Sequence, residues 1–154
     1  MTADRPWPDL AGRIIEDAGG RRHVLPVRVY FEDTDFSRLA YHASYVRWFE
    51  RGRSDFLRLA GNDHRELFEG RAGREPAAFV VRRLNIEYLK PAHIDEVLEV
   101  ATRVGEIGAA HMMLDQRITR EGRELCRADV MVVLVSISGK PMRLGQALRA
   151  AMQP

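Results

Sequence analysis

Apolar side chains recur every three or four positions between residues 41 and 60, which predicts a helix with one buried face. The members of this stripe are Tyr41, Tyr45, Phe49, Gly52, Phe56 and Leu59. Gly52 costs a helix about 1 kcal/mol relative to alanine, and we expect it to let another element pack closely. Gly61 and Asn62 predict the helix end.

A period of two replaces the helical spacing farther along the chain, and it predicts β-strands. The predicted strands cover residues 79–91, 95–108, 111–122 and 126–141, and one more, 23–31, precedes the helix. Strict alternation in the strand over 79–91 predicts that five side chains lie on one face of the strand: Val80, Arg82, Leu84, Ile86 and Tyr88. Short turns between consecutive strands favour antiparallel pairing.

One apolar-striped helix has to be buried, and the sheet is the large apolar surface that can bury it. We therefore predict an α+β fold, in which a curled antiparallel sheet of about five strands wraps one long central helix. The expected organisation is an N-terminal arm over residues 1–22, a domain over 23–140 and a C-terminal tail, predicted to be helical, over 141–154. Residues 61–76 are expected to form a polar connector with a short helical turn.

The composition is that of one globular domain, with 154 residues, 45% hydrophobic and 30% charged. No apolar run approaches the roughly 18 residues of a membrane span, and the N-terminus lacks a secretory pattern, so we expect a cytoplasmic protein. Cys126 is alone and is interpreted as a core thiol. The net charge is only +2, and basic residues alternate with acidic ones, which disfavours nucleic-acid binding.

The stretch YFEDTDFSRLAYHASYVRWFE crowds three acids, Glu32, Asp33 and Asp35, in front of the predicted helix. Glu32 and Asp33 are interpreted as turn and capping residues, and their charge is expected to raise the pKa of Asp35. The sequence has no GxSxG motif and no glycine-rich phosphate loop. The histidines have no metal-ligand spacing, so we predict neither a metal nor a cofactor.

The motif VRVYFEDTDxxxxxYHASYVRWFERGR and the stretch FVVRRLNIEYLKPAHIDEVLEV resemble hotdog-fold acyl-CoA thioesterases of the 4-hydroxybenzoyl-CoA type. They are most similar to the short-chain acyl-CoA thioesterases associated with the bacterial Tol-Pal envelope system. The resemblance runs from about Val27 to Ser138. It implies a hotdog fold whose copies pair through their sheets, as a homodimer or homotetramer with active sites at the dimer interface.

The resemblance assigns the catalytic carboxylate to Asp35, acting as nucleophile or as general base for water. It assigns the amide that polarises the thioester carbonyl to His42, because free N–H groups at a helix start bind anions. Tyr41 and Ala43 are expected to contact substrate beside it. Tyr45 is either a further substrate contact or part of the core stripe.

Coenzyme A phosphates need cations, and Arg82 and Arg83 are candidates, with Lys90 and Arg38 as further ones. The family usually has a glycine in the stretch that matches Phe36–Leu39, and this chain has none there. The loop is therefore expected to avoid positive φ. The tail MRLGQALRAAMQP also replaces the family's proline-containing end with a predicted helix.

The leading hypothesis is hydrolysis of acyl-CoA thioesters that carry a short aliphatic or aromatic acyl group. One alternative keeps this chemistry on acyl carrier protein, an acidic partner that a basic surface would attract. The other is a non-catalytic acyl-CoA-binding or scaffold protein. Glu50, two turns into the helix, is interpreted as a solvated partner of a nearby arginine or as a group at the subunit interface.

Overall fold

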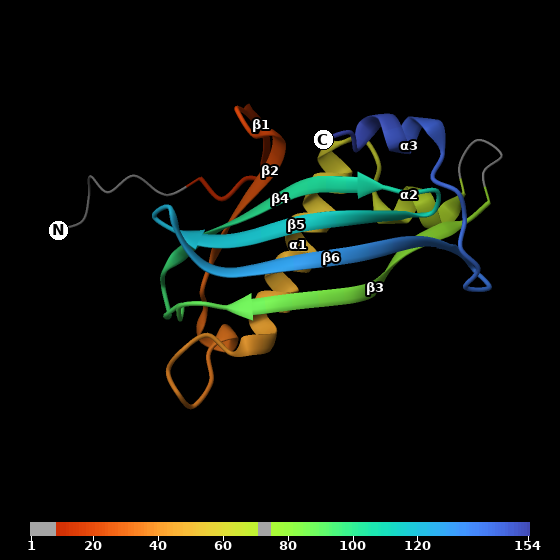
Figure 1. Cartoon of the computed structure of the whole chain (residues 1–154). Helices are drawn as coiled ribbons and strands as arrows, with labels where there is room; N and C mark the ends of the chain where they lie inside the picture. Colours follow the sequence, from red (N-terminus) through yellow and green to blue (C-terminus); the bar gives the residue numbers. More distant parts are fainter. Residues whose placement is uncertain (1–8, 71–74) are drawn as a thin grey trace.

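One long helix, α1 (His42–Leu59), lies across the inner face of a six-stranded antiparallel sheet, which curls around it (Figure 1). The structure, a computed structural model, describes residues 9–70 and 75–154. The strand order is β1-β2-β4-β5-β6-β3. The strands are β1 (Arg13–Asp17), β2 (Gly20–Arg28), β3 (Ala77–Tyr88), β4 (Val97–Ile107), β5 (His111–Arg120) and β6 (Arg123–Ser136). The predicted α+β architecture is confirmed, with six strands instead of about five.

Three short elements complete the described residues: the 3₁₀ turn η1 (Phe31–Asp33) and the helices α2 (His64–Glu69) and α3 (Gln146–Ala151). Of these, α2 lies in the predicted connector and α3 in the predicted tail. Residues 71–74 of that connector lie outside the described residues. Leu148 of α3 and the adjacent Met152 are buried in the hydrophobic core.

The predicted arm over residues 1–22 contains β1 and the start of β2, while residues 1–8 lie outside the described residues. β1 pairs with β2 as a hairpin, and Gly20 supplies a φ of 98° at the turn. Five residues are too few for alternation to identify such a strand. The Gly-Gly pair at the turn was the signal for it.

The helix buries four of the six predicted stripe residues, Tyr45, Phe49, Gly52 and Phe56. The prediction is wrong for the two residues at the ends of the stripe, Tyr41 and Leu59, which are each 44% exposed. Trp48 and Leu57 are buried as well. The buried face is therefore centred slightly to one side of the predicted stripe and does not reach its ends.

Gly52 brings the helix backbone against the sheet, as its place in the stripe predicted. A Cβ there would lie 2.9 Å from Val100 Cγ1 and 3.3 Å from both Thr102 Oγ1 and Gln116 Nε2. The fully buried Gln116 amide donates to the Phe49 carbonyl at 2.9 Å and to the Thr102 hydroxyl at 2.8 Å. The centre of the helix–sheet contact is thus a hydrogen-bonded amide, which is satisfied although it is buried.

A second polar contact ties the helix to β2. His23 is fully buried, and its Nε2 is hydrogen-bonded to Asp55 Oδ2 at 2.7 Å. Its ring stacks on Phe56 with centroids 5.4 Å apart. Burial lowers the pKa of His23, and the neighbouring Asp55 carboxylate opposes this effect only in part. A neutral imidazole that donates one N–H to the carboxylate fits this site.

Within the described part of the chain, β3 is an edge strand that pairs with β6 alone, and its register shifts between Val81 and Arg83. Val81 lies opposite the buried Val132, whereas Arg83 lies opposite Met131. The bulge puts one extra residue in β3 and reverses the alternation before it. The predicted face was therefore wrong at its start, because Val81 and not Val80 continues the inward face of Leu84.

Replacing Gly52 with leucine should lower the free energy of unfolding by about 2 kcal/mol, since the added atoms collide with Val100 and displace the Gln116 amide. Urea denaturation measures this change. The matched control is Arg51→Leu on the exposed side of the same helix, which should stay within about 0.5 kcal/mol of wild type. Equal stability of the two variants would show that close packing at Gly52 is unimportant.

Candidate active site at the start of the central helix

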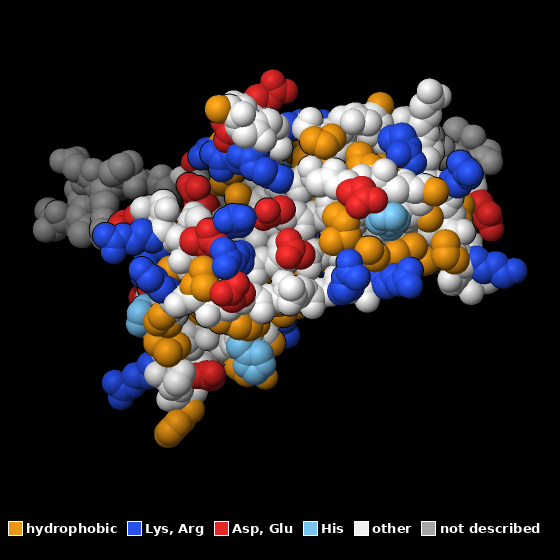
Figure 2. Space-filling view, viewed as in Figure 1, with side chains coloured by type: hydrophobic (Ala, Val, Ile, Leu, Met, Phe, Trp, Pro, Cys, Tyr) orange, Lys and Arg blue, Asp and Glu red, His pale blue; other side chains and the backbone are white. Residues whose placement is uncertain are grey.

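Asp35 lies in a tight loop that closes just before α1. Thr34 and Ala40 form an isolated antiparallel bridge across the loop. Inside this bridge, the Asp35 N–H donates to the Leu39 carbonyl at 3.1 Å. The Asp35 side chain is exposed. In Figure 2 the loop projects from the lower left of the molecule, and hydrophobic atoms lie at its tip.

Ser37 binds the Asp35 carboxylate. Its backbone N–H donates to Asp35 Oδ1 at 2.8 Å, and its hydroxyl donates to the same oxygen. These two donors hold the pKa of Asp35 below its usual range, and the hydroxyl has the larger effect. The nearby His42 lowers the pKa further. The expectation that the neighbouring acids raise the pKa of Asp35 was therefore wrong. The Asp33 carboxylate instead accepts the Tyr30 N–H at 2.8 Å.

Arg38 occupies the left-handed region, with a φ of 70°. The expectation that a loop without glycine avoids positive φ was therefore wrong. The bridge around the loop and the bond from the Arg38 N–H to the Asp35 carbonyl at 3.0 Å fix the backbone there. A side chain in this conformation costs roughly 1–2 kcal/mol relative to glycine, so the loop contains strain directly beside Asp35.

The Asp33 carbonyl joins this loop to the helix. It accepts the Tyr41 N–H at 2.7 Å and the Ser44 hydroxyl at 2.9 Å. Within residues 9–70 and 75–154, the N–H groups of His42 and Ala43 donate to no protein acceptor. Two amides at the positive end of the α1 dipole are thus free to bind an oxygen that carries negative charge.

A shallow groove of about 310 Å³ runs past the helix start. Its lining residues are Leu39, Ala40, His42, Tyr45, Tyr88, Leu89, Lys90 and Pro91. The Tyr88 hydroxyl donates to the His42 carbonyl at 2.8 Å. Tyr45 also lines the groove, although it is buried and its hydroxyl accepts the Ala92 N–H at 3.1 Å.

The predicted site residues fall into two groups. His42 and Tyr45 line the groove, Tyr41 and Ala43 flank His42 at the start of α1, and Asp35 lies in the loop that precedes the helix. Arg82 and Arg83 lie in the middle of β3, five or more residues before Tyr88, which is roughly 17 Å or more along a strand. One chain therefore does not bring these two arginines to Asp35.

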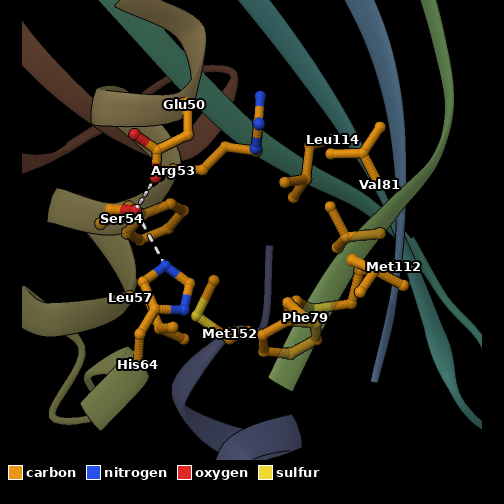
Figure 3. A pocket seen from close by; sticks show the side chains of 13 residues that line it. Glu50, Arg53, Ser54, Leu57, His64, Phe79, Val81, Met112, Leu114 and Met152 are labelled. Carbon is orange, nitrogen blue, oxygen red and sulfur yellow. Dashed lines mark hydrogen bonds between the residues drawn. The ribbon is translucent and has the colours of Figure 1, made fainter. Parts of the chain in front are cut away.

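A separate apolar pocket of about 140 Å³ lies between α1 and β3 (Figure 3). Its apolar lining includes Leu57, Phe79, Val81, Met112, Leu114 and Met152. Glu50, Ser54 and His64 line it on one side. The Ser54 hydroxyl donates to the Glu50 carboxylate, so His64 Nε2 must donate to the Ser54 oxygen, at 2.8 Å.

Sequence reasoning missed this hydrogen-bonded chain. Glu50 was interpreted as the partner of an arginine or as an interface group; it acts electrostatically on Arg53, and its carboxylate also accepts the Ser54 hydroxyl. The spacing of Glu50 and Ser54, four residues apart on one helix, was the available signal. His64 arrives from another element, α2, and no local pattern connects it to them.

The remaining candidate features are the single thiol, possible metal ligands and possible membrane-spanning helices. Cys126 is a buried free thiol, as predicted, and burial raises its pKa to about 12. Residues 9–70 and 75–154 contain no group of three His, Cys, Asp or Glu side chains that could hold a metal ion. Among the same residues, no helix combines the length and apolar character needed to cross a membrane.

A family model described as the thioesterase superfamily matches residues 39–127 of this chain. The chain is 38% identical over 128 residues to the acyl-CoA thioesterase YbgC of Haemophilus influenzae, covering 82% of this chain and 91% of that protein. The chain belongs to the thioesterase superfamily. The resemblance inferred from the motifs and the prediction of a thioesterase are thereby confirmed.

Two further thioesterases are similar over most of the chain. The acyl-CoA thioester hydrolase YbgC of Escherichia coli O6:H1 is 39% identical over 127 residues, covering 81% of this chain and 91% of that protein. The probable thioesterase from Bartonella henselae has a solved structure that superposes with a TM-score of 0.78 at 41% identity, covering 80% of this chain and 99% of that chain. The family match includes His42 but begins after Asp35, so the role of Asp35 depends on the loop itself.

Removing the Ser37 hydroxyl should raise the pKa of Asp35. Ser37→Ala deletes the strongest donor to the carboxylate and keeps the backbone N–H, so the acid is less favoured as an anion. A carbon-13 NMR titration of the Asp35 carboxyl group measures the midpoint directly. Ser37→Thr keeps a hydroxyl and should titrate like wild type, and an unchanged midpoint in Ser37→Ala would contradict this account.

Arg38→Gly should raise the free energy of unfolding by up to about 1 kcal/mol, because glycine adopts positive φ without the side-chain penalty. Urea denaturation provides the measurement. Arg38→Ala also removes the charge but keeps a side chain at positive φ, so it should bring no such gain. If alanine stabilises the protein as much as glycine does, charge and not backbone strain is the cause.

Proposed function

We propose that the protein hydrolyses acyl-CoA thioesters to a carboxylic acid and coenzyme A, with the reaction at the junction of the Asp35 loop and α1. The observation that carries this proposal is an ionised carboxylate held next to a helix start whose amides at His42 and Ala43 are free. Relatives named acyl-CoA thioesterases, with 38–39% identity, support the substrate class.

The two parts of the site perform complementary tasks. The His42 N–H, with Ala43 beside it, binds the thioester carbonyl oxygen and stabilises the negative charge that develops on it. Losing one such donor typically costs on the order of 10²- to 10³-fold in rate. The Ser37 donors favour the ionised form of Asp35, which a nucleophile or base must be, and both bind its Oδ1.

Two routes fit this arrangement. In the first, Asp35 attacks the carbonyl carbon, the thiolate of coenzyme A leaves, and water then cleaves the mixed anhydride to release the acid. In the second, Asp35 takes a proton from a water that attacks the carbon, and the proton passes to the departing thiolate. A single turnover in ¹⁸O-water separates them, because only the anhydride route transfers label to or from Asp35.

The coenzyme A phosphates are assigned to exposed cations. Lys90 lines the groove at the helix start, and Arg38 lies in the loop beside Asp35. Arg82 and Arg83 are further exposed candidates, farther along β3. Arginine suits this role because its planar group binds phosphate oxygens in pairs.

The active unit is proposed to be a homodimer, or a homotetramer built from such dimers, with two β3 edges paired. β3 is twelve residues long and, among residues 9–70 and 75–154, pairs only with β6, so its other edge has backbone groups that no described strand uses. Phe31 and Phe36 in the Asp35 loop are 82% or more exposed, and a second copy would cover them. Such an interface places the sites at its rim.

The test is thiol release from acetyl-, hexanoyl-, decanoyl- and benzoyl-CoA by wild type and Asp35→Asn. The variant should lose roughly 10²-fold or more in kcat and keep its melting temperature, because asparagine still accepts the Ser37 bonds. The control, Glu32→Gln, alters a neighbouring exposed acid and should keep wild-type kinetics. An active Asp35→Asn enzyme would refute the role of Asp35.

The same assay decides between the alternatives. Faster turnover of the acyl chains on acyl carrier protein than on coenzyme A would make the carrier protein the substrate. No thiol release above the Asp35→Asn background on either carrier would overturn the enzymatic proposal. It would favour a non-catalytic acyl-binding protein.

A further inference from the structure

We propose that Tyr88 is a positioning residue of the thioester site that acts through the backbone. Its hydroxyl polarises the peptide group between His42 and Ala43, and this makes the Ala43 N–H a stronger donor to the carbonyl oxygen of the substrate. This inference rests on the proposed thioester hydrolysis. It adds a side chain from a distant strand to the site, and it gives the two free amides of the helix start different supports.

Tyr88 is aimed at the helix start by aromatic contacts. It is the last residue of β3, and its hydroxyl donates to the His42 carbonyl at 2.8 Å (Figure 1). Its ring meets the ring of Tyr45 edge-on, with centroids 5.3 Å apart, and the ring of His42 at 6.4 Å. Tyr45 is buried in the core, so the ring of Tyr88 rests on a fixed neighbour while its hydroxyl reaches the main chain.

The hydroxyl of Tyr88 is a neutral donor. Burial raises the pKa of Tyr88 above its ordinary value, and the neighbouring Cys126 and Tyr45 raise it further. The phenol therefore stays protonated at neutral pH, as a hydrogen-bond donor must be. The bond is not needed to satisfy the His42 carbonyl, because in an α-helix the N–H four residues later already binds that oxygen. The second donor instead acts on the electronic state of the peptide group.

Peptide conjugation carries this effect to the other end of the group. Because the C–N bond has partial double-bond character, a hydrogen bond accepted by the carbonyl makes the N–H of the same peptide group a stronger donor. The carbonyl of His42 and the N–H of Ala43 belong to one peptide group. The bond from Tyr88 therefore strengthens the Ala43 amide, by roughly the 10–30% that such cooperativity supplies per bond.

The His42 amide has a matching support from the helix itself. It shares its peptide group with the Tyr41 carbonyl, which accepts the Ser44 N–H at 2.8 Å. Both free amides thus belong to peptide groups whose carbonyls are hydrogen-bonded. The Ser44 donor is main chain, whereas the donor from Tyr88 is a side chain that a substitution can remove.

Tyr88 acts on the reaction without touching the reacting atoms. The carbonyl and the N–H of a trans peptide group point in opposite directions. A hydroxyl bound to the His42 carbonyl is therefore on the far side of the peptide group from an oxygen bound at the Ala43 N–H. Negative charge on that oxygen grows from the ground state to the transition state, so a stronger amide should raise kcat more than it lowers KM.

The first experiment measures kcat and KM of Tyr88→Phe with the fastest thioester of the acyl-CoA panel. Since one donor is weakened and not lost, kcat should fall roughly 10-fold, less than the 10²- to 10³-fold for a deleted donor, while KM stays within about 2-fold. The control, Tyr30→Phe, removes a hydroxyl from another exposed ring and should keep wild-type kinetics. Melting curves verify that both variants fold.

The second experiment separates polarisation from a purely structural tie. Tyrosine, 3-fluorotyrosine and 3,5-difluorotyrosine at position 88 have nearly the same shape but increasingly acidic hydroxyls. At mildly acidic pH, where these phenols are protonated and Asp35 is ionised, kcat should rise roughly 2-fold with each fluorine. A hydroxyl that only holds the helix in place would give equal kcat for all three.

A nitrogen-15 NMR spectrum of the free enzyme tests which amide Tyr88 supports. In Tyr88→Phe the amide nitrogen of Ala43 should move upfield, because its peptide group loses a hydrogen bond at the carbonyl. The nitrogen of His42, whose peptide group keeps the Ser44 donor, should move less. A larger shift at His42 than at Ala43 would contradict the assignment of Ala43.

The outcomes separate this inference from the proposed function. Wild type that cleaves no thioester overturns the proposed function, and the inference fails with it. Wild type that cleaves thioesters as fast as Tyr88→Phe overturns the role of Tyr88 alone. A variant that loses affinity but keeps kcat would make Tyr88 a substrate contact, and equal kcat across the fluorinated series would make it a structural tie. Either result overturns polarisation and leaves thioester hydrolysis intact.

Discussion

Close contact between the middle of α1 and the sheet is the constraint on which this structure depends. At Gly52 no side chain separates the helix from β4 and β5, so the buried Gln116 amide can reach the Phe49 carbonyl. This contact fixes the depth of the helix against one half of the sheet. The other half, toward β3, is left uncovered, and its open surface becomes the apolar pocket. A bulkier residue at Gly52 would shift the helix and change both the pocket and the orientation of the helix start.

The proposed reactive end is built from main-chain bonds instead of packing. The Asp33 carbonyl accepts both the Tyr41 N–H and the Ser44 hydroxyl, which brings the loop back onto the first turn of α1. Asp35 then lies beside amides that nothing in the described chain uses. Strain at Arg38 persists because the loop bridge on either side fixes its backbone. Rigid placement of a charged group is the condition for electrostatic catalysis without reorganisation.

Periodicity was sufficient to predict the helix, most strands and their antiparallel order, because each of these depends on which face is buried. It failed where hydrogen bonds decide the geometry. The bulge after Val81 has no signature in the alternation, and the pairing of His23 with Asp55 joins residues from separate elements. At Asp35, counting nearby charges predicted the wrong direction for the pKa, because two donors from Ser37 outweigh neighbouring acids that point elsewhere. Sequence motifs identified the candidate site, but the apolar pocket required distant segments to be brought together.

The bond from the Tyr88 hydroxyl to the His42 carbonyl connects the outermost strand to the first turn of the helix. Any movement of that edge is therefore transmitted to the amides of the first turn. An isolated subunit, whose outer strand has no neighbour on one side, would hold these amides less firmly than an assembled one. Under the proposed pairing of two β3 edges, subunit association would tighten the geometry of these amides, and dilution would weaken catalysis before it unfolded the protein.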